Sequence, residues 1–297
     1  MDLLTLRADK LHLQLAPHIG GSIARFYSKH HGQPTHWFRP ATDDALVRQD
    51  ITAMASFPMV PYCGRIRDRQ FQTPQGDTVR LPVLNGLQHA LHGIGWLRPW
   101  TVVQQTEDSA HLRLVVDAAD WPYPFQADQS FTLTDTGLTQ TLTLTHHGST
   151  PMPYGLGFHP YFCRTQDARV TLNSAGHWLS DQAVLPLRPS DDHFLSNTLA
   201  GVFDPAQHVL DNTFFGWQHT ATVTLGTHAI TLKSSAPADF FAIYTPENED
   251  YFCLEPCTHV PDFPNLTAFD AALTGGHWLN QDEQLSITCV YDVSEAL

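Results

Sequence analysis

Two segments of the chain place a side chain that could transfer protons among aromatic and apolar residues. His159 lies in GLGFHPYF (155–162), and its imidazole suits proton donation and acceptance near neutral pH. A core histidine hydrogen-bonded to backbone is the alternative interpretation. Glu255 lies in FCLEPC (252–257). Burial there would raise its pKa toward that of a general base working near neutrality, whereas a surface-loop carboxylate would keep its ordinary pKa.

A second histidine, His92, occurs in LHGIGW (91–96), where the glycine that follows it permits a close approach of the backbone. It could contact a ligand or simply complete a turn. His89 is nearby, and we favour His92 because the glycine follows it directly.

Arg65, Arg67 and Arg69 alternate in CGRIRDR (63–69). If this stretch is extended, the three arginines share one face, with Asp68 on the other. A solvated face is the simplest interpretation. One arginine pointing into a cleft could instead hold ligand hydroxyls or a developing oxyanion, and the spacing does not choose which.

Asp211 lies in LDNTFFGW (210–217) and could bind a ligand or stabilise a turn. Aromatic residues recur in the same segments. Trp96, Phe158, Tyr161 and Trp217 could offer an apolar platform to a ligand, and core packing explains them equally well.

The bulk composition limits the partners of the protein. The chain has 297 residues and a formal net charge of −14, from 16 Lys and Arg against 30 Asp and Glu, which argues against nucleic acid and anionic membranes. Five cysteines occur without a Cys-x-x-Cys pair, so a zinc site is not indicated and reduced thiols are expected. The sequence shows neither a signal-peptide pattern nor an apolar run of about 18 residues, which favours a cytoplasmic protein.

Alternation of apolar and polar residues dominates the elements that must hold these side chains. Period-two strands are predicted at 111–118, 130–148, 170–176, 220–235 and 284–293, with a hairpin turn at 135–137 and further hairpins across 4–33. Helical periodicity is scarce. The sequence therefore predicts one all-β domain, 1–297, with many antiparallel strands in a large sandwich or barrel and a few short helical turns.

Taken together, the segments resemble the aldose 1-epimerase (galactose mutarotase-like) family. The matching motifs are GRI after a Pro-Tyr loop, LHG..W, GFHPYF, D..F.GW and CLEP followed by DFPN, in the family's order, and LTGGHWLNQDEQLSIT is similar to its finishing strand. The resemblance covers essentially the whole chain. It implies a large antiparallel β-sandwich, a sugar bound in a cleft across one sheet, and no metal or organic cofactor.

The resemblance implies that His159 is the general acid and Glu255 the general base. Around the sugar we expect Arg65, His92, Asp211, Tyr161, Trp96 and Trp217. One position departs from the family, which commonly has Asn immediately before the arginine, where this chain has Gly64. A side-chain hydrogen bond to the sugar is therefore missing or supplied elsewhere, and the identity of the sugar stays open.

Exchange of anomers needs one base and one acid on opposite sides of a held sugar, and no nucleophile, metal or redox centre. We therefore predict a mutarotase acting on a free sugar, as a monomer or homodimer. Three alternatives remain: a non-catalytic sugar-binding protein, a cupin-like metalloenzyme with His92, His159 and Glu255 as ligands, and a glycosidase using Glu255 and Asp211. The absence of a His-x-His pair weakens the metalloenzyme.

Overall fold

Antiparallel sheets account for most of the protein, as the alternating sequence predicts. The computed structural model describes residues 3–30, 33–84, 86–192 and 201–295. About half of the chain is strand and 8% is helix, which confirms the all-β prediction. The largest sheet has nine strands in the order β10 (Thr101–Gln105), β11 (Ser109–Val116), β12 (Phe125–Leu133), β13 (Gly137–His146), β27 (Gln284–Glu295), β23 (His228–Ser234), β22 (Thr220–Leu225), β17 (Ala168–Leu172) and β20 (Val202–Phe203).

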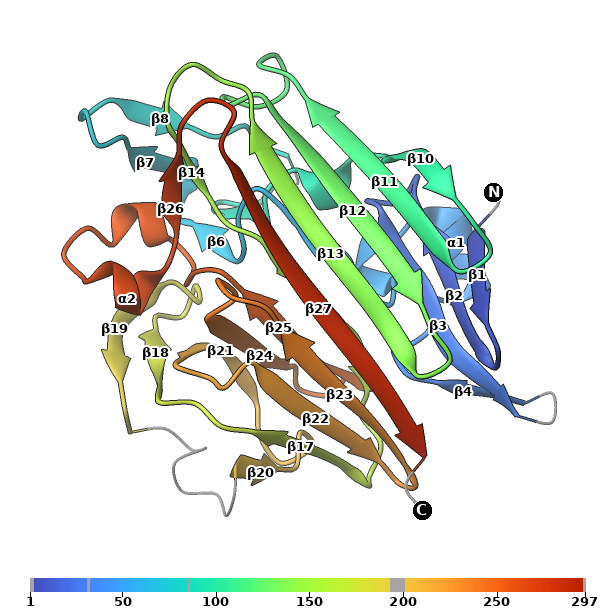
Figure 1. The fold of residues 1–297 in the computed structure, drawn as a ribbon. Helices are drawn as coiled ribbons and strands as arrows, with labels where there is room; N and C mark the ends of the chain where they lie inside the picture. The colour runs from blue at the N-terminus through green and yellow to red at the C-terminus, as the bar shows by residue number, and fades with distance from the viewer. Residues whose placement is uncertain (1–2, 31–32, 85, 193–200, 296–297) are drawn as a thin grey trace.

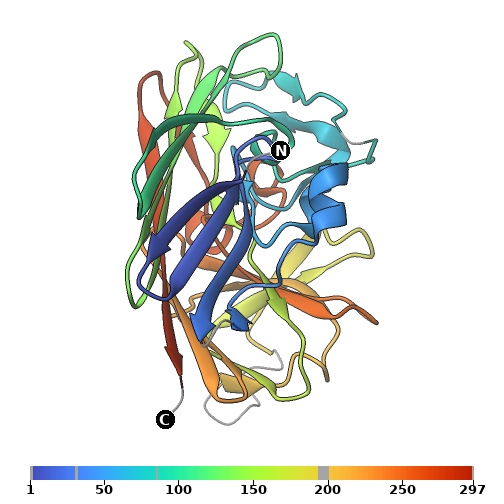
Figure 2. The ribbon, with the colours of Figure 1, turned by 90° about the vertical axis from the view of Figure 1, so that its right-hand side faces the viewer.

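An eight-stranded sheet faces the large one and carries the site described below. Its strands run in the order β19 (Pro186–Ser190), β18 (Gly176–Ser180), β21 (Leu210–Phe215), β24 (Phe240–Thr245), β25 (Tyr251–Cys257), β15 (Gly157–Phe158) and β5 (Pro58–Met59), and β16 (Tyr161–Cys163) also pairs with β25. Figure 1 shows the nine-stranded sheet in front of it, and Figure 2 shows the large sheet from its side.

Smaller elements complete the fold. A four-stranded sheet contains β1 (Leu4–Ala8), β2 (Leu11–Ala16), β3 (Ser22–His30) and β4 (Gln33–His36), which confirms the hairpins expected near the N-terminus. The two-stranded sheets are β14 (Met152–Tyr154) with β26 (His277–Leu279), β6 (Arg65–Ile66) with β9 (Ala90–Leu91), and β7 (Gln70–Gln72) with β8 (Thr78–Arg80). The helices are α1 (Asp43–Arg48) and α2 (Ala271–Thr274), with 3₁₀ turns η1 (Ile51–Ala53), η2 (Arg67–Arg69), η3 (Gly95–Leu97) and η6 (Phe263–Asn265).

The threonine-rich strands show why the alternation was informative. β12 and β13 form the predicted hairpin, in which Thr134 N–H donates to Gly137 O. On β13, Leu142 and Leu144 are fully buried, whereas Thr141 faces outward and its hydroxyl hydrogen-bonds Thr288 Oγ1 at 2.9 Å. Polar β-branched residues thus line one face of the sheet while leucines fill the other.

The core between the two large sheets leaves one face of the eight-stranded sheet available. On β25, Phe252 and Leu254 are fully buried in the core, so the alternate residues Glu255 and Cys257 point to the opposite face. A second cluster of buried apolar side chains covers that opposite face. None of the helices in the described part of the chain has the length and apolar composition of a membrane span.

Candidate active site

A cavity of about 280 Å³ opens on the face of the eight-stranded sheet that is turned away from the core. Neighbouring strands β21, β24 and β25 form its floor. The residues they contribute are mostly alternate ones: Asp211, Thr213, Ala242, Tyr244, Tyr251, Glu255 and Cys257. The loop before β6, the loop after β9 and the segment between β15 and β16 supply part of the walls.

Glu255 lies within β25 and lines the cavity floor. The strand continues past Glu255, because Pro256 keeps the register and pairs with Phe241 of β24. The carboxylate is therefore held by a central strand, not by a loop. Burial raises the pKa of Glu255 well above its usual value, since desolvation disfavours the carboxylate, while the nearby Arg65 acts in the opposite direction.

His159 lies in the short connection between β15 and β16. Its backbone N–H donates to Phe57 O at 3.0 Å. Phe57 and Tyr161 both pack against its ring, at centroid distances of 4.5 Å and 4.7 Å and interplanar angles below 30°, and these two rings also contact each other at 6.1 Å. Burial lowers the pKa of His159 to about 3, a backbone hydrogen bond opposes that shift, and the positive charge of Arg39 adds to it.

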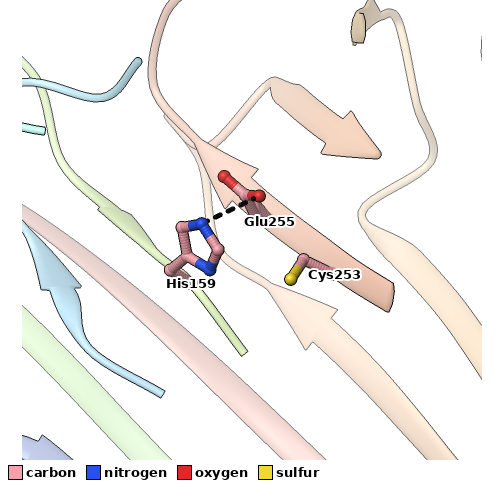
Figure 3. Close-up of side chains that lie close together, drawn as sticks. All are labelled: His159, Cys253 and Glu255. Carbon is pink, nitrogen blue, oxygen red and sulfur yellow. Dashed lines mark ion pairs between the residues drawn. The ribbon is translucent and has the colours of Figure 1, made fainter. Parts of the chain in front are cut away.

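The two proton-transfer candidates contact each other directly. His159 Nε2 lies 3.3 Å from Glu255 Oε1, and both side chains are less than 10% exposed (Figure 3). Both pKa shifts favour the uncharged forms of the two side chains, which is the arrangement with the transferable proton on Glu255. The contact provides a path along which that proton can pass to the imidazole.

His92 also lines the cavity, as predicted, and its hydrogen bonding fixes its tautomer. His92 Nδ1 accepts the backbone N–H of Gly64 at 3.1 Å. Burial lowers the pKa of His92 well below its usual value, so the ring is neutral and its remaining nitrogen, Nε2, carries the hydrogen. That N–H is a donor available to a ligand. His89, in contrast, accepts the backbone N–H of Asp68 outside the cavity lining.

Arg65 is the arginine that reaches the cavity. Its Nη1 lies 3.9 Å from Asp211 Oδ2, so the β6 arginine and the β21 aspartate meet across the cavity. Partial burial raises the pKa of Asp211, and the Arg65 charge opposes this shift. The two residues form a paired anion and cation that can hydrogen-bond neighbouring hydroxyl groups of a sugar.

The expectation that Arg65, Arg67 and Arg69 share one extended face is wrong. The chain turns after β6 into η2, where Asp68 and Arg69 have positive φ angles of 51° and 56°. Arg67 then pairs with Asp181 and Asp262, both at 3.5 Å, and Arg69 donates to the carbonyls of Leu87 and Gln88. This local turn directs Arg67 and Arg69 away from the cavity and leaves Arg65 as the arginine that lines it. Alternation in the sequence does not predict such a turn.

Trp96 and Tyr161 line the cavity, whereas Phe158 and Trp217 do not, and Phe158 is fully buried in the core. The Trp217 side chain lies in the core, where its Nε1–H donates to Ala238 O at 2.8 Å and its ring packs 4.5 Å from Phe241. Trp217 is therefore corrected from a candidate sugar contact to a packing residue. Its position just after β21 turns it toward the inner side of the sheet.

The sequence did not identify several side chains of the site. Trp178 on β18 and Tyr244 on β24 line the cavity from strands whose alternation gave no functional signal. Arg39 lies behind the site, with its guanidinium 4.2 Å from the ring of Tyr161 and 4.6 Å from that of Tyr251. It also donates to the carbonyls of Thr52 and Met54. Only the fold brings Arg39 to His159, through the intervening tyrosine.

Gly64 has a steric reason for being glycine. Its φ is +63°, and a Cβ atom there would lie 2.6 Å from the Pro261 side chain. Its own N–H is used by His92. Pro261 therefore occupies the space that a longer side chain would need, and this part of the wall offers a sugar no side-chain hydrogen bond.

Comparison with known proteins gives a consistent result. The family model "Aldose 1-epimerase" matches residues 2–292. The uncharacterized protein YphB of Escherichia coli K12 is 30% identical over 276 residues, covering 88% of this chain and 90% of that protein. A solved structure from E. coli K12, provisionally named an aldose 1-epimerase, superposes with a TM-score of 0.87 at 26% identity and 99% coverage of both chains. Galactose 1-epimerase of Lactobacillus acidophilus shares the fold, with a TM-score of 0.77 at 16% identity, over 99% of this chain and 95% of that one. The chain thus belongs to the aldose 1-epimerase family.

Proposed function

We propose that the protein is a mutarotase, which interconverts the α and β anomers of a free sugar. The observation that carries this proposal is the buried contact between His159 and Glu255 on the wall of the cavity. An imidazole and a carboxylic acid sharing one proton form an acid–base pair that works in both directions without a cofactor. Family membership and the neutral donor on His92 support the same function.

Ring opening requires two proton transfers. With the shared proton on His159, the Glu255 carboxylate removes the proton of the anomeric hydroxyl, and that O–H electron pair forms the C1=O1 double bond. The C1–O5 bond breaks, and its electron pair on O5 takes the proton from His159. The pair is left as protonated Glu255 and neutral His159, which is the form that burial favours.

Ring closure follows the same steps in reverse. Rotation about the C1–C2 bond presents the other face of the aldehyde to O5. His159 then removes the O5 proton, and Glu255 protonates the former carbonyl oxygen, giving the other anomer. The pair returns to its starting form, so no proton has to be exchanged with water during a cycle.

The remaining polar groups hold the sugar while C1–C2 rotates. Arg65 and Asp211 hydrogen-bond sugar hydroxyls, and His92 Nε2–H donates to an oxygen near the reacting centre. Trp96 and Tyr161 cover the apolar C–H face of the ring. Holding the sugar at several points keeps the open-chain form in place until it closes again.

An NMR screen of anomer exchange tests this proposal. Free hexoses, pentoses and acidic sugars would be mixed individually with the enzyme, and exchange between α and β signals measured by saturation transfer. Acceleration of at least one sugar is expected. Calorimetric binding of a sugar without any acceleration would overturn the proposal in favour of a non-catalytic sugar-binding protein.

A further inference from the structure

A third potential ligand atom lies beside the proton-transfer pair. Cys253 and Glu255 are two residues apart on β25, so their side chains share a face of the strand. The Cys253 thiol, a Glu255 carboxylate oxygen and a His159 ring nitrogen all lie within 4.8 Å of one another (Figure 3). All three residues are buried. The mechanism above uses two of them and gives Cys253 no role.

The spacing of these atoms is close to that of a tetrahedral metal site. With Zn–N and Zn–O bonds of about 2.0–2.2 Å, two ligand atoms on one zinc ion are ~3.4 Å apart, and a sulfur and a nitrogen are ~3.6 Å apart. His159 Nε2 and Glu255 Oε1, at 3.3 Å, already have that separation. Cys253 has to approach by about 1 Å at most to complete the set.

We infer that His159, Cys253 and Glu255 form a binding site for a divalent ion of the zinc class, which occupies the cavity in place of the sugar. Thiolate, imidazole and carboxylate are the ligands that zinc takes, and three protein ligands leave a fourth position for water. Magnesium and calcium are disfavoured, because they require six or more oxygen ligands. The sequence suggests His92, His159 and Glu255 as metal ligands, but in the described part of the chain the ligand atoms that lie within 4.8 Å of one another are those of His159, Cys253 and Glu255, without His92.

Charge balance favours an ion at this buried position. A Zn²⁺ ion with one thiolate, one carboxylate and one neutral imidazole has no net charge, so the complex avoids most of the cost of a buried charge. Burial raises the pKa values of Cys253 and Glu255, and the ion must displace both protons. Binding therefore releases protons and tightens as the pH rises.

Bound metal and catalysis are mutually exclusive at this site. The ion would use the lone pairs of Glu255 and His159 that accept protons in the reaction. Zinc is thus an inhibitor of the enzyme. This consequence depends on the proposed function, whereas the binding site itself does not.

Cobalt spectroscopy tests the site without any assay of activity. The full-length chain, purified without a histidine tag and stripped with a chelator, is titrated with Co²⁺. A near-ultraviolet cobalt–thiolate charge-transfer band is expected in the wild type and should disappear when Zn²⁺ displaces the cobalt. Cys253→Ala should abolish the band and weaken Co²⁺ binding by at least about 100-fold, because a direct ligand should matter no less than the outer-shell partners, whose loss costs about 10–100-fold.

The matched control is Cys257→Ala. Cys257 flanks Glu255 on the other side of the same strand face, but it does not belong to the three-ligand group. Its variant should keep the cobalt–thiolate band. Cys253→Ser preserves the size of the side chain and should also lack the band. Loss of the band in this variant therefore reflects the missing thiolate and not misfolding. A wild type without the band, a Cys253→Ala variant that retains it, or a Cys257→Ala variant that loses it would overturn the site.

A separate experiment tests whether zinc inhibits anomer exchange. Zn²⁺ should slow anomer exchange in the wild type, and a chelator should restore it. Each variant is compared with its own metal-free rate, and Cys253→Ala should need at least about 100-fold more Zn²⁺ for the same fractional inhibition. Equal inhibition of both proteins would overturn the inhibitory role. A wild type that shows no exchange would overturn the proposed function instead, and the cobalt spectra would still decide the site.

Discussion

The imidazole of His159 and the carboxylate of Glu255 are joined by a 3.3 Å contact between Nε2 and Oε1, inside a cavity that excludes most water from both. One proton can therefore move between them before a sugar binds. In the proposed ring opening, Glu255 takes the proton of the anomeric hydroxyl while His159 gives its own proton to the ring oxygen. With a sugar bound, the net transfer of a proton between His159 and Glu255 therefore passes through the sugar and not across their direct contact.

Replacing Glu255 by glutamine should lower the rate of anomer exchange by about 10²–10⁴, because an amide cannot accept the anomeric proton. Circular dichroism and sugar binding by calorimetry serve as controls for folding and for the cavity. His159→Gln should cause a loss of similar size. Exchange near the wild-type rate in both variants would contradict the assigned roles.

The same Glu255→Gln variant should change how stability depends on pH. Burial raises the pKa of Glu255 in the folded state, so the folded protein binds a proton that the unfolded chain has already released. The contribution of Glu255 to the unfolding free energy of the wild type therefore decreases as the pH rises above about 4.3, the ordinary pKa of glutamate. Melting temperatures at pH 5 and pH 8 should show the variant gaining relative to the wild type at the higher pH.

Removing the charge of Arg39 should move the acid limb of the pH–rate profile. The His159–Glu255 pair loses its base when it takes up a second proton. Burial, aided by the charge of Arg39, lowers the pKa of His159 to about 3, so this second protonation requires acid. Activity should therefore persist well below pH 6. Arg39→Met should shift the limb to higher pH, whereas Arg39→Lys, which keeps the charge, should shift it less. Identical limbs in wild type and Arg39→Met would contradict an electrostatic role for this residue.

Restoring the asparagine typical of the family at position 64 should damage the protein. Pro261 would clash with the new Cβ, and overpacking of this kind costs about 1–3 kcal/mol. Gly64→Asn is expected to lower the melting temperature and kcat/KM. The double variant with Pro261→Ala should recover part of the stability, because it removes the Cγ atom at 2.6 Å and keeps the Cβ atom at 2.9 Å. If the Gly64→Asn variant is as stable as the wild type, the cavity wall at Pro261 can move to accommodate the new side chain.

Two tryptophans should respond differently to substitution by phenylalanine. Trp178 lines the cavity, so Trp178→Phe should raise KM. Trp217 lies in the core, so Trp217→Phe should leave KM unchanged and lower the unfolding free energy by about 1–3 kcal/mol, through the lost hydrogen bond to Ala238 and poorer packing. The opposite pattern would place Trp217, not Trp178, against the sugar.

The parts of this site that sequence could predict are those with a local signal. The strands follow from alternation, since a period of two is the direct consequence of a pleated sheet with one buried face. His159, Glu255 and His92 were found because each interrupts an apolar, glycine- or proline-rich segment. The single-domain organisation and the monomeric or dimeric state stay predictions.

The parts that escaped prediction depend on contacts between distant segments. Arg39 acts through Tyr161, more than 100 positions later in the chain, and no local pattern marks it. The choice of Arg65 depends on a turn with positive φ at Asp68, a conformation open to few residues and not announced by alternation. Trp217 was misplaced because its segment looks the same whether the ring packs inward or lines a cavity.

Arg39 packs over the ring of Tyr161, and Tyr161 and Phe57 both pack against the imidazole of His159, and this cluster has an evolutionary consequence. A side chain of different size at Arg39, Tyr161 or Phe57 would move the imidazole away from Glu255, so a single substitution would be counter-selected although none of these three residues transfers a proton. Related sequences should therefore exchange these positions in concert. The loop that carries Arg39, outside the cavity, should vary as slowly as the residues that line it.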